Sequence, residues 1–331
     1  MTRGYSASFR LICACLASLV LYALAFGFIL DRPLALGFLR RQIDAKLERA
    51  AAIDGPKLVI LAGSNGPYPH RCEIIEAMLA MPCVNGGIAV GIGLDYVFAR
   101  WRERLRPGDV IYLPMEEEQY THSRAATALG PDASIMFRRD WRTLAVLPPE
   151  RWLAALFSYD LRAALMSLIE MSLVEIDFHD PRAGIIGETN AWGDHAGHTT
   201  DRATVSRAVL AGVVLHHANA ANIAAGYGST LIGAFVHWAH AHNIRAIGGP
   251  PPQFFDSPMP DVAEQAIRAV YLANGGEYLD LPDRARYPRT AFFDTAEHLN
   301  EPWQIWHSAV VAQALAELLH RPLVHVDQEA E

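Results

Sequence analysis

The chain has 331 residues, with 28 Lys or Arg against 36 Asp or Glu, so its formal net charge is −8. Hydrophobic residues make up 51% of it and charged residues only 19%, below the roughly 25% of an average globular protein. These values exclude a disordered chain, a collagen and a small disulfide-stapled domain, and the length suits one large domain or two small ones.

Residues 1–33 are predicted to form an uncleaved signal anchor. Leu11–Leu30 is a run of twenty residues without a charge, long enough for one helix to cross a bilayer core of roughly 30 Å. Arg3 and Arg10 precede this run, and no cleavage site of the A-x-A kind closes it. We therefore expect a single membrane-spanning helix at the N-terminus.

Residues 34–54 are predicted to form an amphipathic juxtamembrane stalk, because apolar residues recur at helical spacing between Arg and Lys residues. The apolar positions are Leu36, Leu39, Ile43 and Leu47. The basic side chains would reach lipid head groups. They also follow the predicted span, so the positive-inside rule taken alone places the large domain in the cytoplasm.

The rest of the chain is acidic. Residues 1–50 hold seven basic and three acidic side chains, which leaves 21 basic and 33 acidic ones beyond residue 50. Such a body has no basic stripe with which to neutralise phosphates, so nucleic acid is not expected as a partner.

Residues 55–322 are predicted to form one α/β domain. The predicted strands are short apolar runs at residues 57–62, 83–85, 109–114, 243–248 and 278–280. Helices are predicted at about 71–79, 94–105, 219–242, 260–274 and 301–319. Strands that alternate with helices indicate a parallel sheet with helices on both faces.

Three segments stand apart from this alternation. Residues 120–215 contain Trp-rich and Pro-containing stretches and are predicted to be a lid inserted at the ligand-binding edge of the sheet. Residues 323–331 form an acidic tail. Four glycines between Gly86 and Gly93 predict a loop whose backbone closely approaches another segment.

Residues suited to nucleophilic catalysis gather where predicted strands end. In an open parallel sheet the ligand binds beyond the carboxyl ends of the strands. Ser64 follows the first strand, and Asp294 and His298 lie in the loop before the last helix. Serine attacks an ester when a histidine takes its proton and a carboxylate orients that histidine. Two structural alternatives remain open: Ser64 caps the following helix, or His298 pairs at the start of the last helix.

Three motifs, in this order, resemble the sequence blocks of SGNH (GDSL-like) hydrolases. They are Ile60–Asn65, Asn85–Gly87 with Gly91, and Phe293–Asp294 with His298–Asn300. The resemblance covers about residues 57–319 and, within that superfamily, points to membrane-anchored members associated with cell-surface polysaccharide O-acylation and lipoteichoic-acid D-alanylation. It implies a flavodoxin-like three-layer α/β/α sandwich with about five parallel strands, and no cofactor.

The same resemblance implies a catalytic triad with Ser64 as nucleophile, His298 as base and Asp294 as its orienting carboxylate. Glu297 is the alternative orienting residue. The implied activity is that of an extracytoplasmic serine esterase or O-acyltransferase acting on acyl esters of a cell-surface polysaccharide or glycan. Hydrolase and transferase share the acyl-enzyme and differ in how well water is excluded, so the choice between them stays open.

The resemblance also implies an oxyanion hole built from the backbone N–H groups of Ser64, Val90 and Gly91. Val90 stands where the family usually has glycine. Glu116 follows the third strand, where the family supplies an Asn side chain, and an ionised glutamate would repel an oxyanion. The candidate oxyanion and substrate-binding residues are Val90, Gly91, Asn65, Glu116 and Asn190.

Partners and location follow from the same resemblance. One span cannot carry acyl groups across a bilayer, so a transferase would need a multi-spanning membrane acyltransferase as donor. The expected location is the bacterial inner membrane with the body facing the periplasm or cell exterior, since large domains translocate largely regardless of charge. The alternative function is a catalytically degenerate binding or scaffold component of a polysaccharide modification or export assembly.

Several His and Cys residues could in principle bind a metal ion or form a disulfide. His195 and His198, and the group His237, His240 and His242, are interpreted as a polar lid and an exposed helix face, so no metal site is expected. Cys72 and Cys83 could pair in an oxidising compartment, but the sequence alone leaves their connectivity open.

Overall fold

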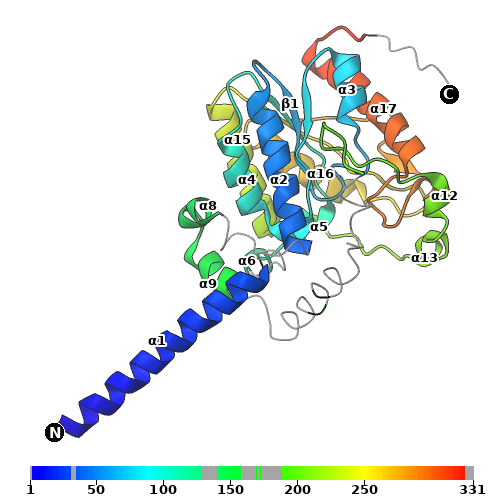
Figure 1. The fold of residues 1–331 in the computed structure, drawn as a ribbon. Coiled ribbons are helices and arrows are strands. Elements are labelled where there is room, and N and C mark those ends of the chain that lie inside the picture. The colour runs from blue at the N-terminus through cyan, green and yellow to red at the C-terminus, as the bar shows by residue number, and fades with distance from the viewer. Residues whose placement is uncertain are drawn as a thin grey trace.

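The computed structural model describes residues 2–30, 35–128, 140–157, 169, 172 and 188–324. Its centre is a five-stranded parallel sheet (Figure 1). The strands are β1 (Leu58–Ile60), β2 (Cys83–Asn85), β3 (Val110–Leu113), β4 (Arg245–Gly248) and β6 (Glu277–Tyr278), in the spatial order β2-β1-β3-β4-β6. Counted along the chain, this is the doubly wound order 2-1-3-4-5. The predicted α/β class and five-stranded parallel sheet are confirmed.

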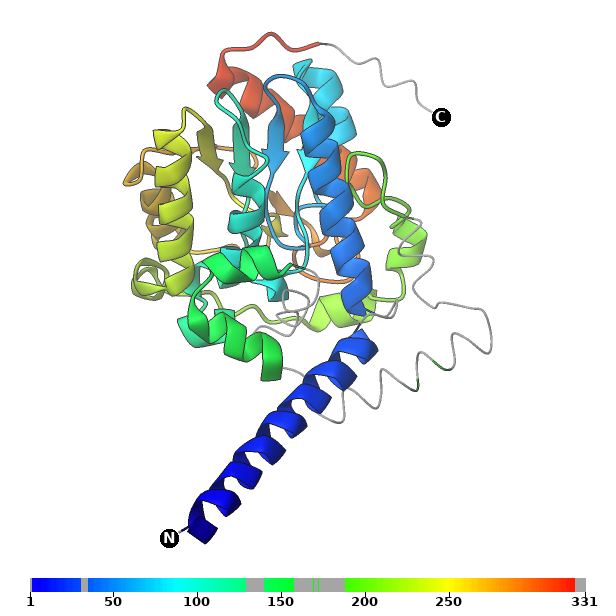
Figure 2. The ribbon, with the colours of Figure 1, turned by 60° about the vertical axis from the view of Figure 1, so that its left-hand side comes forward.

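Helices cover both faces of this sheet (Figures 1 and 2). Successive side chains of a strand point to opposite faces, so Val59 and Leu61 belong to one apolar cluster, and Leu58 and Ile60 to another. The first cluster includes side chains of α2 (Ala35–Ala52), α4 (Leu94–Arg102), α15 (Tyr227–Ala241) and α16 (Asp261–Leu272). The second includes side chains of α3 (Cys72–Leu79) and α17 (Glu301–Leu319). This arrangement is compatible with a three-layer sandwich.

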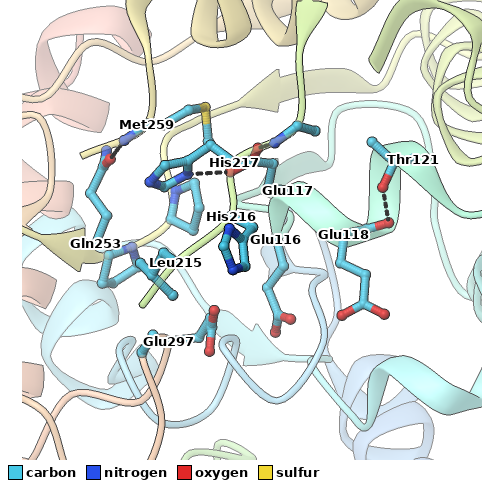
Figure 3. A pocket seen from close by; sticks show the side chains of 14 residues that line it. Glu116, Glu117, Glu118, Thr121, Leu215, His216, His217, Gln253, Met259 and Glu297 are labelled. Carbon is cyan, nitrogen blue, oxygen red and sulfur yellow. Dashed lines mark hydrogen bonds and ion pairs between the residues drawn. The ribbon is translucent and has the colours of Figure 1, made fainter. Parts of the chain in front are cut away.

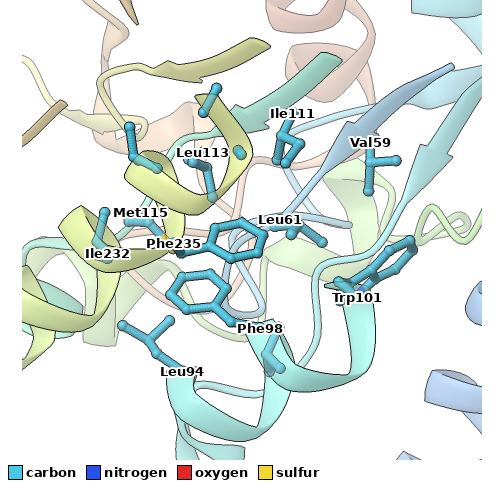
Figure 4. Packing of buried hydrophobic residues seen from close by; sticks show 14 of the residues in the cluster. Val59, Leu61, Leu94, Phe98, Trp101, Ile111, Leu113, Met115, Ile232 and Phe235 are labelled. Carbon is cyan, nitrogen blue, oxygen red and sulfur yellow. The ribbon is translucent and has the colours of Figure 1, made fainter. Parts of the chain in front are cut away.

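The larger cluster is centred on an aromatic pair between α4 and α15 (Figure 4). The rings of Phe98 and Phe235 stack with centroids 4.1 Å apart. Leu61 and Leu113 approach them from the sheet (Figure 4). Because large buried aromatic side chains remove much apolar area from water, this pair fixes the helices against β1 and β3.

The helix predicted over residues 219–242 is two helices. They are α14 (Ala220–Ala225) and α15, and the break falls at Gly226. A Cβ atom at Gly226 or Gly228 would overlap the carbonyl oxygens of Tyr120 and Gln119. The close approach of α5 (Glu117–Thr121) to this point therefore explains both the glycines and the interruption.

The segment predicted as a lid, residues 120–215, contains short helices in its described parts. They are the end of α5, α6 (Arg124–Ala128), α8 (Trp141–Val146), α9 (Pro149–Phe157), α12 (Thr200–Ala203) and α13 (Arg207–Gly212). Residues 129–139 and most of 158–187 lie outside the described residues. A buried ion pair between Arg151 and Asp95 (2.9 Å) attaches α9 to α4.

Short elements missing from the sequence interpretation complete the fold. β5 (Gln253–Phe254) and β7 (Arg286–Tyr287) form a separate two-stranded parallel sheet. Two 3-10 turns, η1 (Val90–Ile92) and η2 (Arg289–Ala291), lie in loops. Of the acidic tail, residues 325–331 lie outside the described residues.

The N-terminal helix α1 (Thr2–Leu30) projects from the body in both views (Figures 1 and 2). In the part of the chain that the structure describes, no helix meets the length and apolarity needed to cross a membrane. The next helix, α2, has its predicted amphipathic character, but its apolar side chains Leu47 and Ala50 are buried in the core of the α/β body. Lys46, on the same helix, is buried too and donates to the carbonyls of Gly87 (2.6 Å) and Gly193 (2.9 Å). The segment predicted to be a stalk on the bilayer is thus packed as part of the domain.

Candidate active site

Ser64 lies directly beyond the carboxyl end of β1, in a turn that precedes α3. Hydrogen bonds from Gly66 N–H to Gly63 O (3.0 Å) and from His70 N–H to Gly66 O (3.2 Å) hold this turn. Ser64 is partly exposed, whereas Asn65 is fully buried and donates from Nδ2 to Pro114 O (2.6 Å). The turn is therefore tied to the end of β3.

The glycine-rich loop after β2 packs against this turn, backbone to backbone. A Cβ atom on Gly66 would lie 2.7 Å from the Cα of Gly87, so neither residue tolerates a side chain. Asn85 Nδ2 donates to Gly66 O (3.1 Å), and Asn85 Oδ1 accepts from Gly87 N–H (3.2 Å). The close backbone approach predicted for this loop is the contact with the Ser64 turn.

Asp294 and His298 meet in the loop before α17. His298 Nδ1 lies 2.6 Å from Asp294 Oδ1. A carboxylate at this distance makes Nδ1 the protonated nitrogen, which leaves the Nε2 lone pair available as a base. The imidazole also stacks on the ring of Tyr68, with centroids 3.9 Å apart and planes 7° apart. Because Tyr68 belongs to the turn that holds Ser64, this stacking joins the nucleophile segment to the base.

The structure brings the three predicted triad residues to one edge of the sheet without completing every contact. Within the described residues, no hydrogen bond joins Ser64 Oγ to His298. Catalytic hydrogen bonds are often long in ligand-free sites and tighten when substrate binds. His298 makes its carboxylate contact with Asp294, and no hydrogen bond links it to the alternative, Glu297, in the described part of the chain.

Backbone donors are free where the oxyanion hole was predicted. The N–H groups of Ser64, Val90 and Gly91 form no hydrogen bond with the described residues. Val90 and Gly91 begin η1, where N–H groups have no partner within the helix. The Val90 side chain covers Gly63, where a Cβ atom would overlap it. Valine at position 90 thus leaves these backbone N–H groups without a partner in the described residues.

The three consecutive glutamates after β3 have different environments. Glu117 accepts hydrogen bonds from His217 Nδ1 (2.8 Å) and Ala218 N–H. Glu118 is largely exposed and pairs with His122. Glu116 is largely buried beside the Ser64 turn, and its Oε1 would lie 2.8 Å from a Cβ atom on Gly63.

The environment of Glu116 favours the protonated acid. Burial, followed by the nearby carboxylate of Glu297, raises the pKa of Glu116 to about 8. A hydrogen bond from the Asn65 N–H opposes this shift without cancelling it. Burial also raises the pKa of Glu297. The Glu116 carboxyl, which would repel an oxyanion if it were ionised, is therefore mostly neutral at pH 7.

A pocket of about 350 Å³ opens beside this site (Figure 3). Its lining comes from the start of α5, residues 215–218, the turn around Pro251, Met259 and the Ala296–Glu297 segment. The carboxyl groups of Glu116 and Glu297 point toward the same region of the pocket, next to the ring of His216 (Figure 3). Ser64 and His298 are not among its lining residues.

A buried chain of hydrogen bonds under the Ser64 turn was not predicted. His70 Nδ1 lies 3.2 Å from both Asn65 O and Gly66 O, so it carries the hydrogen and Nε2 is an acceptor. His307 Nε2, 3.2 Å away, must then donate to His70 Nε2. Tyr287 O–H in turn donates to His307 Nδ1 (2.7 Å). Burial lowers the pKa of both histidines, to about 3 for His307, so the chain consists of neutral groups.

Asn190, predicted to bind substrate, has other partners. Its Nδ2 donates to Asp194 Oδ2 (3.1 Å) and its Oδ1 accepts from Asp194 N–H (3.0 Å). Asp194 Oδ1 accepts from Asn85 Nδ2 (3.0 Å) and from the N–H of Cys72 (2.9 Å). Cys72 also forms a disulfide with Cys83. Asn190 thus organises a loop that holds the end of β2 to the start of α3, and it does not line the pocket.

In the described residues no group of three or more His, Cys, Asp or Glu side chains is placed to hold a metal ion. His195 and His198 instead pack around Tyr68, with ring centroids 4.1 Å and 5.3 Å from it. Burial lowers the pKa of His195 to about 4 and that of His198 to about 3. These neutral rings pack against Tyr68, which in turn stacks on His298.

No protein-family model matches the sequence, and no curated protein matches it.

Proposed function

We propose that this protein is an SGNH-type serine esterase or O-acyltransferase that acts on acyl esters of a cell-surface polysaccharide or glycan. The main support is the 2.6 Å contact between His298 Nδ1 and Asp294 Oδ1, at the same edge of the sheet as Ser64. The stacking of Tyr68 on His298 ties this pair to the Ser64 turn. The three motifs and the strand order agree with this assignment.

The chemistry follows from these positions. His298 Nε2 takes the proton of Ser64 Oγ as that oxygen attacks the ester carbonyl. The oxyanion forms near the free N–H groups of Ser64, Val90 and Gly91. His298 then gives the proton to the departing alcohol, which leaves an acyl group on Ser64. Water, or a sugar hydroxyl activated by His298, removes that acyl group and restores the enzyme.

An extracytoplasmic body is part of the proposal. The Cys72–Cys83 disulfide is typical of oxidising compartments such as the periplasm. The charge-free run Leu11–Leu30 is proposed as the anchor in a bacterial inner membrane, and the described apolar side chains of α1, such as Leu16 and Leu21, are exposed. A multi-spanning membrane acyltransferase would supply activated acyl groups if the enzyme is a transferase.

A second candidate function is a degenerate binding or scaffold component. The missing hydrogen bond between Ser64 and His298 in the described residues favours it. In that case the site would bind an acylated glycan without cleaving it.

Ester hydrolysis by the full-length chain in detergent separates the two functions. We expect turnover of short acyl esters and of acetylated oligosaccharides that is abolished in Ser64→Ala. Binding of acetylated oligosaccharide with equal, background turnover in both proteins would instead establish the scaffold function.

Orientation is tested independently of turnover. Alkaline phosphatase fused after Glu331 should be active in cells, because the enzyme folds only where its disulfides form. An inactive phosphatase together with a fluorescent green-protein fusion at the same point would place Ser64 in the cytoplasm and contradict a role in surface-polymer acylation.

A further inference from the structure

Glu116 lies where the resemblance predicts a side chain that donates a hydrogen bond to the oxyanion. The residue found there is acidic. It follows β3 as the residue before α5, while Ser64 follows β1, and these two strands are neighbours in the sheet. Asn65 links the two strand ends through its hydrogen bond to Pro114 O. Glu116 is therefore fixed beside the nucleophile turn by the sheet itself.

The surroundings of the Glu116 carboxyl provide no cation. Its Oε1 is buried and has no hydrogen-bond partner in the described residues. Within the same residues no Lys, Arg or His forms an ion pair with it, in contrast to Glu117 and Glu118. A buried carboxylate without a cation is costly, and such a group usually takes up a proton instead.

The titratable groups around Glu116 come from two segments. Glu118 lies in α5, which begins directly after Glu116, and Glu297 lies in the loop before α17. Of the neighbouring charges, that of Glu297 has the largest influence on the pKa of Glu116. His216 lines the same pocket as Glu116 and Glu297 (Figure 3). His298 follows Glu297 directly in the chain. Both neighbouring carboxylates oppose ionisation of Glu116, and both add to the effect of burial.

We propose that Glu116 acts as a neutral acid that donates its carboxyl hydrogen to the oxyanion of the tetrahedral intermediate. It would take the place of the amide side chain that the third sequence block otherwise supplies. This inference rests on the proposed function, since it concerns the same acyl-transfer site. A buried carboxylic acid kept neutral to donate such a hydrogen bond is a known device in enolate chemistry.

No net proton transfer involves Glu116. The proton of Ser64 passes to His298 and then to the departing alcohol, while Glu116 donates a hydrogen bond and retains its own hydrogen. When Glu116 ionises, the donor is lost and a negative charge faces the developing oxyanion. The donor function is therefore complete below the pKa of about 8 and is lost as the pH rises through it.

The test is the pH dependence of kcat/KM for a short acyl ester between pH 6 and pH 10, with the full-length chain. The rate of Ser64→Ala is subtracted as the hydroxide background. The wild type should lose activity above about pH 8. Glu116→Gln retains a donor that cannot ionise, so it should keep activity at pH 7 and lose the alkaline decline. Glu116→Ala should lower kcat about 10²–10³-fold with a much smaller change in KM.

Two variants make the test decisive. Glu103→Gln removes an exposed carboxylate outside the site, so its pH profile should match that of the wild type. Glu297→Gln removes the neighbouring charge, so it should move the alkaline decline to lower pH. This shift can be measured even if variants of Glu116 itself fail to fold.

The outcomes distinguish this inference from the proposed function. Ser64-dependent turnover whose alkaline decline persists in Glu116→Gln, or does not move in Glu297→Gln, would overturn the role of Glu116 and leave the triad intact. Turnover in Ser64→Ala equal to that of the wild type would overturn the proposed function as well.

Discussion

Buried polar groups have hydrogen-bond or ion-pair partners at the amino ends of β1 and β3, whereas some polar groups at the carboxyl ends lack them. At their amino ends, Lys57 Nζ and Asp109 Oδ2 lie 2.7 Å apart with both side chains fully buried, and Asp109 also accepts from backbone N–H groups. At their carboxyl ends, the buried Oε1 of Glu116 has no partner in the described residues, and the N–H of the partly exposed Ser64 makes no hydrogen bond with them. Buried polar groups are ordinarily satisfied, so under the proposed function a bound ligand would complete the hydrogen bonding at the carboxyl ends.

Substitutions at the two ends of these strands should therefore have different effects on stability and activity. Substitutions at the amino ends should lower the unfolding free energy, because they leave buried charged groups without their partners. Changes at the carboxyl ends should reduce activity and leave stability nearly unchanged or improved, as is common where a site is built from unsatisfied groups.

Among substitutions that keep Ser64 and His298, the largest expected effect is on activity, in Asp294→Asn. The substitution removes the acceptor that keeps the hydrogen on His298 Nδ1, and loss of this orientation in serine hydrolases costs about 10⁴-fold in kcat. Steady-state kinetics would measure it, with unfolding by urea as the check that stability is retained. Glu297→Gln is the matched control: if it lost more activity than Asp294→Asn, the orienting role would pass to Glu297.

The largest expected effect on stability is in Asp109→Ala. Removing one partner leaves the buried Lys57 ammonium unpaired, which costs about 3–5 kcal/mol of unfolding free energy. Asp54→Ala, at an exposed position shortly before β1, should change stability by less than about 0.5 kcal/mol. Equal midpoints of urea unfolding for the two variants would show that the buried ion pair between Lys57 and Asp109 does not stabilise the fold.

A smaller loss of stability is expected for Tyr287→Phe. It removes the hydroxyl that donates to His307 Nδ1 and leaves a buried acceptor unsatisfied, at a cost of about 1–3 kcal/mol. Tyr278→Phe is the control, because the hydroxyl of Tyr278 makes no hydrogen bond with the described residues. An equally small loss of unfolding free energy in both variants would show that the hydrogen bond from Tyr287 to His307 does not stabilise the fold.

The same histidines predict sensitivity to acid. The folded-state pKa of His307 is lowered to about 3, so only the unfolded chain takes up this proton as the pH falls below about 6.5. Unfolding free energy should therefore decrease toward lower pH, by up to about 1.4 kcal/mol for each pH unit in this window. His307→Gln should flatten the decrease relative to wild type, while a substitution of the exposed His242 should not.

Local sequence signals sufficed for the α/β class and the five-stranded parallel sheet. Short apolar runs, three of them followed by glycine, predicted the strands. Strand ends share one edge in a parallel sheet, which is why Ser64 and the loop of His298 were expected at the same edge. The interruption at Gly226 was missed because its cause is the approach of α5, a tertiary contact.

Interactions between distant residues could not be read from the sequence. His70 and His307 are 237 positions apart, and no periodicity links them. The protonation of Glu116 depends on burial and on Glu297, and both arise only on folding. The sequence showed an acidic residue where a donor was expected, but its charge state is a property of the folded site.

The central claim is that Ser64 is a nucleophile activated by His298. Treating the full-length chain with a fluorophosphonate probe and mapping the adduct by mass spectrometry tests it most directly. We expect one covalent adduct on Ser64, which is absent in Ser64→Ala and forms much more slowly in His298→Ala. An unlabelled wild type, or equal labelling of wild type and Ser64→Ala, would contradict it.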